Sequence, residues 1–467
     1  MKKVLFAAVL LLGIQDIVTA QTTPSLKDLI NSALQQDATL KQQTLENQLT
    51  HLDDEKLKDV FLPKVELSGK SGYLYSSATL RSPEITIPPV ANVFPGMVIP
   101  EGQLDNNLHI SGISALADAK ASVLLYSGGK VKYLKEANKE KNLSETMLME
   151  KSRDEVVTAI SKIYDQFALL NESANVLEKG KERLDIMKKT ADKALGYGLI
   201  TTYDSKKIEL AQATLDSKII EYEGKKELLI TQLSLLTGIE KERLADIQPQ
   251  LMPMYPTASG NTIRDRAEIK ALAHGINAAD YKIKAEQRWW TPKVMAQTSA
   301  SYFGLYNNRI STSDPLLPGT GKKLDWHPEN IHVRPIVQIG VGFKWDIFDG
   351  KEGKNATARA RVEKQILESK MKDAQDKLQM NLANNETNYR ITNAQIALKE
   401  KTREIAATAL TNIEKEFRYG TKKSSDYIDA ENDLENAELE YQTAIFNQRR
   451  AAIELMKATQ SLDIDKL

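Results

Sequence analysis

The chain has 467 residues, 63 basic and 63 acidic side chains, and no cysteine. This charge balance gives no support to nucleic-acid binding, and the absence of cysteine excludes disulfides, thiolate metal sites and an acylated-cysteine anchor. The five histidines are scattered, and no phosphate-binding loop, nucleophile elbow or dinucleotide-binding motif occurs in the sequence. We therefore predict a protein that is not an enzyme and that holds no metal or other cofactor.

The first 20 residues have the pattern of a secretory signal peptide. Lys2 and Lys3 form a basic start, residues 4–14 an apolar run, and residues 18–20 (Val-Thr-Ala) a small-residue cleavage site. The apolar run of about 11 residues is shorter than the roughly 20 that a membrane-spanning helix needs, which favours cleavage over an N-terminal anchor. We expect a mature chain that begins near Gln21.

Two motifs recur along the chain at one fixed spacing. Leu-Tyr-Ser-Gly at residues 125–128 recurs as Ile-Phe-Asp-Gly at 347–350, and Tyr197-Gly198 recurs as Tyr419-Gly420. The two offsets are equal, because 350 − 128 and 420 − 198 are both 222. Such self-similarity predicts two copies of one structural unit. We assign the first repeat to residues 21–238 and the second to 263–467, with a linker at 239–262.

Each repeat contains a segment with helical periodicity. Between the two motifs, apolar residues alternate between spacings of three and four, and after each Tyr-Gly they follow at intervals of seven. These positions are Ile208, Leu215, Tyr222, Leu229 and Leu236 in the first repeat, and Ala430, Ala437, Ala444, Ala451 and Ala458 in the second. A sustained seven-residue period requires a partner helix. We expect antiparallel helical hairpins at 129–236 and 351–462, with long arms of roughly 100 Å, and shorter helices at 25–60 and 263–288.

Between the shorter helix and the long arm of each repeat, the apolar period changes to two, which predicts strands. In the clearest case, Val337, Ile339, Val341 and Phe343 alternate with polar residues and glycine. We expect strands at residues 63–77, 108–126, 292–306 and 333–348. Runs of this length reach the 9–11 residues that a transmembrane strand needs, and the proline-bearing loops at 78–107 and 310–332 suit the outer surface.

Four strands per chain cannot close a membrane barrel. An open sheet edge in lipid leaves backbone groups unpaired, at a cost of several kcal/mol for each group. We therefore expect an α+β membrane protein that forms a homotrimer in outer-membrane lipid. Its three chains would build a 12-stranded outer-membrane β-barrel, continued into the periplasm by a long α-helical barrel of coiled-coil hairpins.

This pattern resembles the TolC-like outer-membrane factors over nearly the whole mature chain. The motifs that carry the resemblance are the strand-to-helix turns at residues 126–129 and 348–350 and the hairpin tips at 197–199 and 419–421. The resemblance implies a passive channel-tunnel of a tripartite efflux or type I secretion system in the outer membrane. It also implies that a periplasmic adaptor protein docks at Gly198, Leu199, Gly420 and Thr421, and that an inner-membrane RND or ABC transporter supplies the energy.

The resemblance also implies a gate and a pore constriction at these tips. The positions that match the constriction are Asp426 and Asp429, which a trimer would arrange as two rings of carboxylates. The alternative is that both are first-turn acids of the returning helix, favoured by its dipole. The gate positions are Asp204, Phe417 and Lys422. Phe417 lacks a hydroxyl group, and Lys422 lacks the bidentate fork of arginine.

Two other protein classes share part of this pattern. A periplasmic adaptor also has a helical hairpin and β-structure after a signal peptide, but its hairpin occurs once. An exported coiled-coil scaffold would account for the seven-residue period but not for the long alternating strands. We favour the channel. Drugs, metal ions and proteins are all compatible with it as cargo.

Overall fold

The computed structural model describes residues 23–256, 263–316, 320–459 and 462–467, and divides into two compact units. The described parts of Met1–His51, Lys139–Ala278 and Glu363–Leu467 form the helical unit. Leu52–Asn138 and Ala279–Val362 form the sheet unit. The signal peptide expected at residues 1–20, and residues 257–262 of the expected linker, lie outside the described residues.

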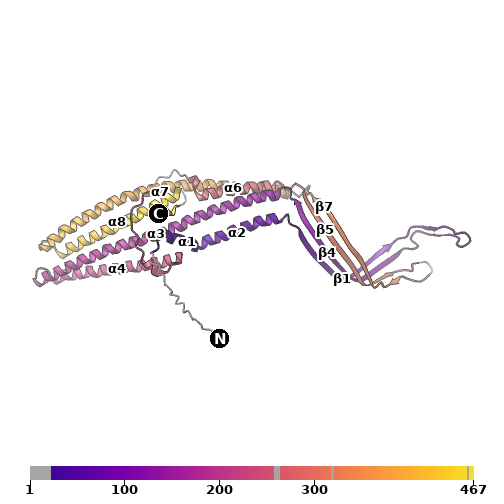
Figure 1. Cartoon of the computed structure of the whole chain (residues 1–467), viewed down its shortest axis with the longest axis horizontal. Helices are drawn as coiled ribbons and strands as arrows, with labels where there is room; N and C mark the ends of the chain where they lie inside the picture. Colours follow the sequence, from indigo (N-terminus) through magenta and orange to yellow (C-terminus); the bar gives the residue numbers. More distant parts are fainter. Residues whose placement is uncertain (1–22, 257–262, 317–319, 460–461) are drawn as a thin grey trace, which may run out of the picture. The chain divides into compact units, whose positions relative to one another are not determined.

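The fold is a mixture of helices and strands and is mostly helical (Figure 1). In chain order, the described α-helices are α1 (Leu26–Gln36), α2 (Ala38–Asp59), α3 (Lys130–Gly196), α4 (Thr202–Thr237), α5 (Lys241–Ala245), α6 (Ala267–Glu286), α7 (Glu352–Arg418) and α8 (Ser424–Thr459). The long strands are β1 (Lys64–Leu80), β4 (Asn106–Tyr126), β5 (Lys293–Thr312) and β7 (Asn330–Lys344). Short strands lie at β2 (Ile85–Ile87), β3 (Met97–Ile99) and β6 (Asp325–Trp326).

The two long helices, α3 and α7, have 67 residues each, and α4 and α8 have 36 each. A helix of 67 residues is about 100 Å long at 1.5 Å per residue. Both long helices end just before a Tyr-Gly pair whose glycine adopts the left-handed conformation, with φ of 68° at Gly198 and 73° at Gly420. None of the described helices has both the length and the apolar character needed to cross a bilayer.

The helix expected at 25–60 is interrupted. At Asp37 the backbone has φ −57° and ψ 124°, and the Asp37 carboxylate accepts a hydrogen bond from the Leu40 amide, which starts α2. The helix expected at 263–288 likewise begins with a 3-10 turn at Ile263–Asp265 and becomes α6 only at Ala267. Helix α4 ends at Gly238, which caps it with φ 70° and lies against Gln36 at the end of α1.

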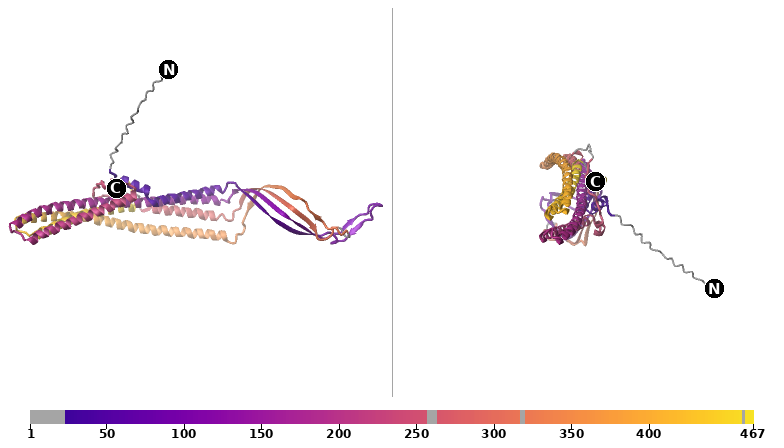
Figure 2. Two further views of the ribbon diagram at one scale, coloured as in Figure 1. Left: turned by 90° about the horizontal axis from the view of Figure 1, so that it is seen from below. Right: turned by 90° about the vertical axis from the view of Figure 1, so that its left-hand side faces the viewer.

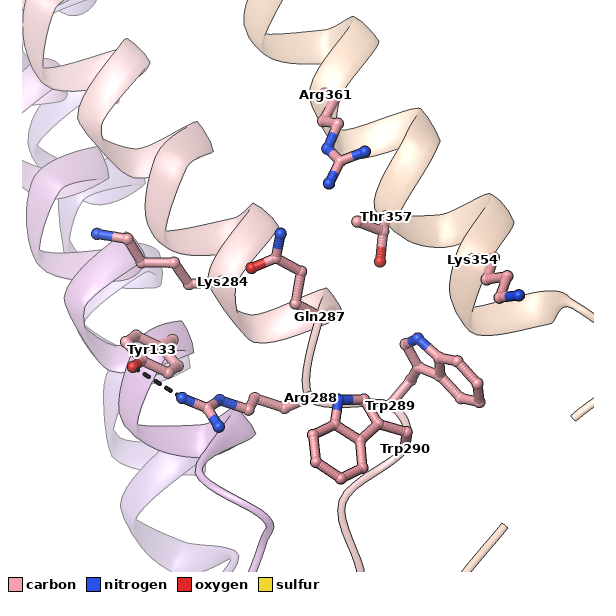
Figure 3. Close-up of a pocket in the computed structure, with 9 residues that line it drawn as sticks. All are labelled: Tyr133, Lys284, Gln287, Arg288, Trp289, Trp290, Lys354, Thr357 and Arg361. Carbon is pink, nitrogen blue, oxygen red and sulfur yellow. Dashed lines mark hydrogen bonds between the residues drawn. The ribbon is translucent and has the colours of Figure 1, made fainter. Parts of the chain in front are cut away.

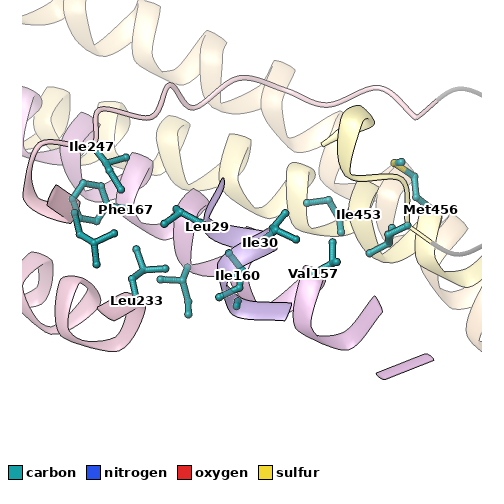
Figure 4. Packing of buried hydrophobic residues seen from close by; sticks show 13 residues of the cluster. Leu29, Ile30, Val157, Ile160, Phe167, Leu233, Ile247, Ile453 and Met456 are labelled. Carbon is teal, nitrogen blue, oxygen red and sulfur yellow. The ribbon is translucent and has the colours of Figure 1, made fainter. Parts of the chain in front are cut away.

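The core of the helical unit has two main apolar clusters. In the first, side chains of α1, α3, α4 and α8 meet; among them Leu29, Ile160, Leu233 and Ile453 are essentially inaccessible to solvent (Figure 4). The second lies between α3, α4, α7 and α8 and contains Ile208 and Leu215, together with the first two of the predicted alanines, Ala430 and Ala437.

The predicted seven-residue period is therefore confirmed for most of its positions. All five alanines of α8 are buried, as are Ile208 and Leu215, and Tyr222 and Leu229 are half-buried. Leu236, at the end of the predicted series, is 39% exposed. Within the helical unit, the long helices α3, α4, α7 and α8 lie side by side along a curve when viewed end-on (Figure 2).

The four long strands form one antiparallel sheet in the order β1-β4-β5-β7, and β6 pairs with the far end of β5. Their register aligns the alternating positions. Leu67, Ala119, Ala300 and Val337 form one row across the sheet, and Val65, Ala121, Thr298 and Ile339 form another. The intervening row on the opposite face is Glu66, Lys120, Ser299 and Gln338. One face is thus mainly apolar and the other polar.

The prediction of a strand at 333–348 is wrong at the C-terminal end, because β7 ends at Lys344. Lys344 pairs with Lys293, the first residue of β5, and the preceding Pro292 has no N–H to continue the ladder. At its other end β7 extends back to Asn330 and passes Pro335 at a register shift opposite Ser301 and Phe303. The loop expected at 310–332 accordingly contains the end of β5, β6 and the start of β7.

Candidate functional site

The turns at the tips of the two helical hairpins have the same hydrogen bonds. In the first, the amide of Gly198 donates to the carbonyl of Leu195, and that of Leu199 donates to Ala194. In the second, Gly420 donates to Phe417 and Thr421 to Glu416. The neighbouring side chains project into solvent: Tyr197 is 81% exposed, Leu199 77% and Tyr419 84%. Each tip therefore presents aromatic or apolar groups on a rigid turn, as a protein-binding surface does.

Asp204 has a local role at the first tip. Its carboxylate accepts hydrogen bonds from the Thr201 amide at 3.0 Å and hydroxyl at 2.6 Å, and its own amide donates to the Thr201 hydroxyl at 3.2 Å. This capping box begins α4. The Thr201 hydroxyl and amide hold the pKa of the Asp204 carboxyl below its usual range. Among the described residues, Lys422 forms no ion pair with Asp204.

Asp426 occupies the corresponding position at the start of α8. Its carboxylate accepts a hydrogen bond from the Lys423 amide at 3.1 Å, so it is a first-turn acid by geometry. Asp426 is half-buried, whereas Asp429, nearly one turn further on, is exposed. Asp429 lines a cavity of about 290 Å³ between α3, α4 and α8, together with Lys207 and Lys218.

Phe417 lies in the core between α7 and α8 and is only 9% exposed. Its ring centroid is 5.9 Å from that of Tyr427, which is 4% exposed. Burial, with the nearby Glu431 and Glu414 carboxylates, raises the pKa of Tyr427 to about 12. Within one chain, this pair is therefore an apolar contact that fixes the end of α7 on the start of α8.

Two ion pairs join the first hairpin to the second close to the tips. The Arg183 guanidinium on α3 donates from Nε to both carboxylate oxygens of Glu431 on α8 at 2.9 Å, and from Nη2 at 2.6 Å. Lys218 on α4 contacts the carboxylate of Glu435, also on α8. The acid side chains are 3% and 5% exposed, respectively. Sequence reasoning missed both pairs, because long polar helices carry many carboxylates. The one available signal was that Glu431 follows Ala430 of the buried alanine row.

Burial makes the Arg183–Glu431 pair sensitive to the loss of either partner. Burial raises the pKa of the Glu431 carboxyl, and the Arg183 guanidinium lowers it only in part. Burial would lower the pKa of Arg183, but the hydrogen bonds and charge of Glu431 outweigh it and raise that pKa. A carboxylate enclosed in this way is tolerated because its partner binds it through both oxygens.

Comparison with known proteins identifies a domain in the second half of the chain. Residues 259–460 match the model of a family described as outer membrane efflux protein. The second half of the chain thus contains an outer membrane efflux protein domain. No curated protein matches the chain in sequence. This domain match confirms the predicted resemblance and the predicted location in the outer membrane.

Solved structures extend the likeness in fold over both halves of this chain. A structure of CusC superposes with a TM-score of 0.70 at 14% identity and covers 94% of this chain and 92% of its own. The outer membrane protein VceC from Vibrio cholerae gives 0.66 at 15% identity, covering 93% and 96%. The CmeC outer membrane channel of Campylobacter jejuni gives 0.65 at 15% identity, covering 94% and 88%. At these identities the comparison establishes the fold.

The outer membrane efflux protein domain identifies the chain as a channel component and not an enzyme, and the adaptor alternative is not favoured. The described residues contain no cluster of three or more His, Asp or Glu side chains arranged to hold a metal ion. The chemistry at the tips is therefore that of ion pairs, helix caps and exposed aromatic groups.

Replacing Arg183 with Gln should destabilise the joined hairpins. The change leaves the Glu431 carboxylate buried without its partner, which costs about 3–5 kcal/mol. We expect a lower midpoint for the loss of helical circular dichroism on heating. Arg183→Met combined with Glu431→Met should recover most of the loss.

Lys181→Gln is the matched control, because it breaks the Lys181–Asp216 pair, whose side chains are 47% and 51% exposed. This change should cost about 0–1 kcal/mol. An equal effect of Arg183→Gln and Lys181→Gln would contradict the role assigned to the buried pair.

Proposed function

We propose that three copies of this chain assemble into a passive exit channel. The four long strands of each chain contribute to a 12-stranded barrel in the outer membrane, and the hairpins form a periplasmic helical barrel. Each chain has two repeats, 21–238 and 263–467, joined by the linker at 239–262. In support of this division, α7 and α8 begin and end 222 residues after α3 and α4, since 352 − 130, 418 − 196, 424 − 202 and 459 − 237 are all equal.

The single observation that carries this proposal is the sheet with one exposed apolar face and two open edges. Val65, Leu67 and Ile339 on that face are 78%, 80% and 85% exposed. Among the described residues, β1 pairs only with β4, and β7 only with β5. Lipid solvates such an apolar face but cannot satisfy open edges, so β1 of one copy must pair with β7 of the next. Three copies close the barrel around the polar face.

The helices also need further copies as partners. Ile391, Leu398 and Ile405 follow one another at intervals of seven along α7 and are 53%, 57% and 63% exposed. A seven-residue apolar row packs into a neighbouring helix, and in one chain this row has little cover. Neighbouring copies would supply that helix. The same exposed row is also expected of a coiled-coil scaffold, but a scaffold would not need the sheet.

At the tips, the trimer would bring Asp426 and Asp429 of three chains together as two carboxylate rings around the pore. Rings of Asp select cations and repel anions. We further propose that Asp204, Phe417 and Lys422 belong to the gate, and that Gly198, Leu199, Gly420 and Thr421 form the surface on which a periplasmic adaptor docks. The exposed tyrosines and Leu199 support docking. An inner-membrane RND or ABC transporter would then deliver the cargo, in an efflux or a type I secretion system.

Val337→Arg should prevent assembly in the outer membrane, because Val337 lies on the exposed apolar face of β7. Arginine on a lipid-facing strand costs about 2–4 kcal/mol near the middle of the bilayer, and the trimer would carry three copies. We expect the heat-resistant trimer band to disappear from the outer-membrane fraction. Gln338→Arg, one residue away on the polar face, should leave the band unchanged. Equal tolerance of both changes, or a stable monomer without channel conductance, would refute the barrel.

Asp426→Ala combined with Asp429→Ala should abolish block by multivalent cations in single-channel recordings, because the change removes six carboxylates from the proposed constriction. Asp373→Ala combined with Asp376→Ala is the matched control, since these two exposed acids also lie three apart, on α7. The control channel should be blocked as the wild type is. Unchanged block in the Asp426 and Asp429 variant would rule out the rings.

Gly420→Trp should stop export in cells while the trimer still assembles, because the indole would cover the docking surface of the second tip. Gly420→Ala is the control. It imposes the same penalty on the left-handed backbone, but it adds only a methyl group into open space. Export should persist with Ala and be lost with Trp, as measured by drug susceptibility of the cells. Equal export by both variants would exclude docking at this turn.

A further inference from the structure

The sheet unit contains a basic cavity of about 750 Å³ between the end of α6 and the start of α7 (Figure 3). Its lining includes Lys284, Arg288, Lys354 and Arg361, together with Trp289 and Trp290. Arg361 and Lys354 come from α7, and the remaining four come from α6 and the loop that follows it. The rest of the lining is uncharged.

The positive charges of this cavity are largely uncompensated. Arg288 donates to the hydroxyl of Tyr133 at 3.2 Å and lies over that ring, which leaves its charge unpaired. Within the described residues, Lys354 and Arg361 form no ion pair or hydrogen bond. The nearby carboxylate of Glu286 is already bound by Lys130 at 2.8 Å. Four cationic groups around one cavity without an acid favour an anionic ligand.

The cavity adjoins the end of the apolar face of the sheet. The indole N–H of Trp345, just beyond β7, donates to the carbonyl of Trp290 at 2.7 Å. Phe343 is 74% exposed, Ile347 76% and Phe348 80%, so exposed apolar side chains continue to the edge of the cavity. Trp289 is fixed against α7, since a Cβ atom at Gly353 would lie 2.1 Å from its ring. Tryptophan and basic side chains together mark the level at which a bilayer meets water.

We propose that this cavity binds the phosphate headgroup of an anionic phospholipid of the inner leaflet. Arg361 and Lys354 contact the phosphate, Arg288 and Lys284 add positive charge, and the acyl chains continue along the apolar face beside Phe343. The proposal rests on the membrane contact of the sheet proposed above. A free anion would gain nothing from contact with the apolar side chains beside the cavity, whereas the acyl chains of a lipid would. These side chains therefore favour a lipid over a soluble phosphate as the ligand.

The test uses the full-length trimer with Trp326→Phe, which removes the indole that lies on β6, beside the far end of β5. The protein is reconstituted in bilayers whose phosphatidylglycerol or phosphatidylcholine carries brominated chains, and the quenching of tryptophan fluorescence is compared. We expect phosphatidylglycerol to be preferred at least fivefold, since a single basic residue near an anionic lipid surface contributes on the order of 1 kcal/mol, which is about a fivefold factor. Arg361→Gln with Lys354→Gln should bring the preference close to one.

Two variants control for charge and folding. Arg361→Lys with Lys354→Arg keeps both charges and should keep the preference. Lys370→Gln with Lys372→Gln removes two exposed charges further along α7, and it should keep the preference as well. The heat-resistant trimer band verifies assembly of each variant, and Arg361→Gln alone replaces the double variant if that variant fails to assemble.

The failures are distinguishable. If neither lipid quenches the fluorescence, the proposed membrane contact of the sheet is refuted, and the proposed lipid site is refuted with it. Equal quenching by both lipids, or a preference that survives in the Arg361→Gln and Lys354→Gln variant, overturns the headgroup site alone. Loss of the preference when millimolar inorganic phosphate is added also overturns the lipid assignment, because the ligand would then be a free anion.

Discussion

The open backbone hydrogen bonds along β1 and β7 are the constraint on which the rest of this structure depends. The register that aligns Leu67, Ala119, Ala300 and Val337 makes one face of the sheet apolar, and lipid can solvate that face. No surrounding lipid can satisfy the edges. Pairing with further copies of the same chain does so without covering the apolar face. In the proposed channel, assembly, membrane contact and a polar interior would all follow from a single register.

The helices meet a related requirement by different means. Their buried seams are narrow, with alanine at every seventh position of α8, so that long helices can lie close together along a curve. The remaining apolar rows, such as Ile391, Leu398 and Ile405 on α7, are exposed in one chain. A single chain therefore leaves unsatisfied surface in both units. The proposed assembly would cover the apolar rows of the helices and pair the open edges of the sheet, while lipid would cover the apolar face of the sheet.

Much of this architecture could be predicted from the sequence, because the periods of seven and two are set by backbone geometry and survive in a single chain. The ends of elements were less predictable. The break at Asp37 depends on one side-chain cap, and the end of β7 at Lys344 depends on Pro292, which immediately precedes the partner strand β5. The Arg183–Glu431 pair joins residues 248 positions apart, and its acid looks like any other on a polar helix until α3 and α8 are packed together. The tips were located through glycine, whose left-handed conformation leaves a sequence signal, whereas burial of Phe417 left none.

The ion pairs between the hairpins have a physical property that apolar contacts lack. Separating two apolar surfaces always costs free energy, because the exposure of apolar surface to water is unfavourable. Separating Arg183 from Glu431 breaks strong hydrogen bonds, but each charge regains its hydration, so the net cost is far smaller than the gross interaction. Such a pair fixes one arrangement of α3 and α8 through its two-oxygen geometry while adding little to the barrier against their separation. The pair therefore specifies the relative position of the two hairpins through its geometry, and not through a large net stabilisation.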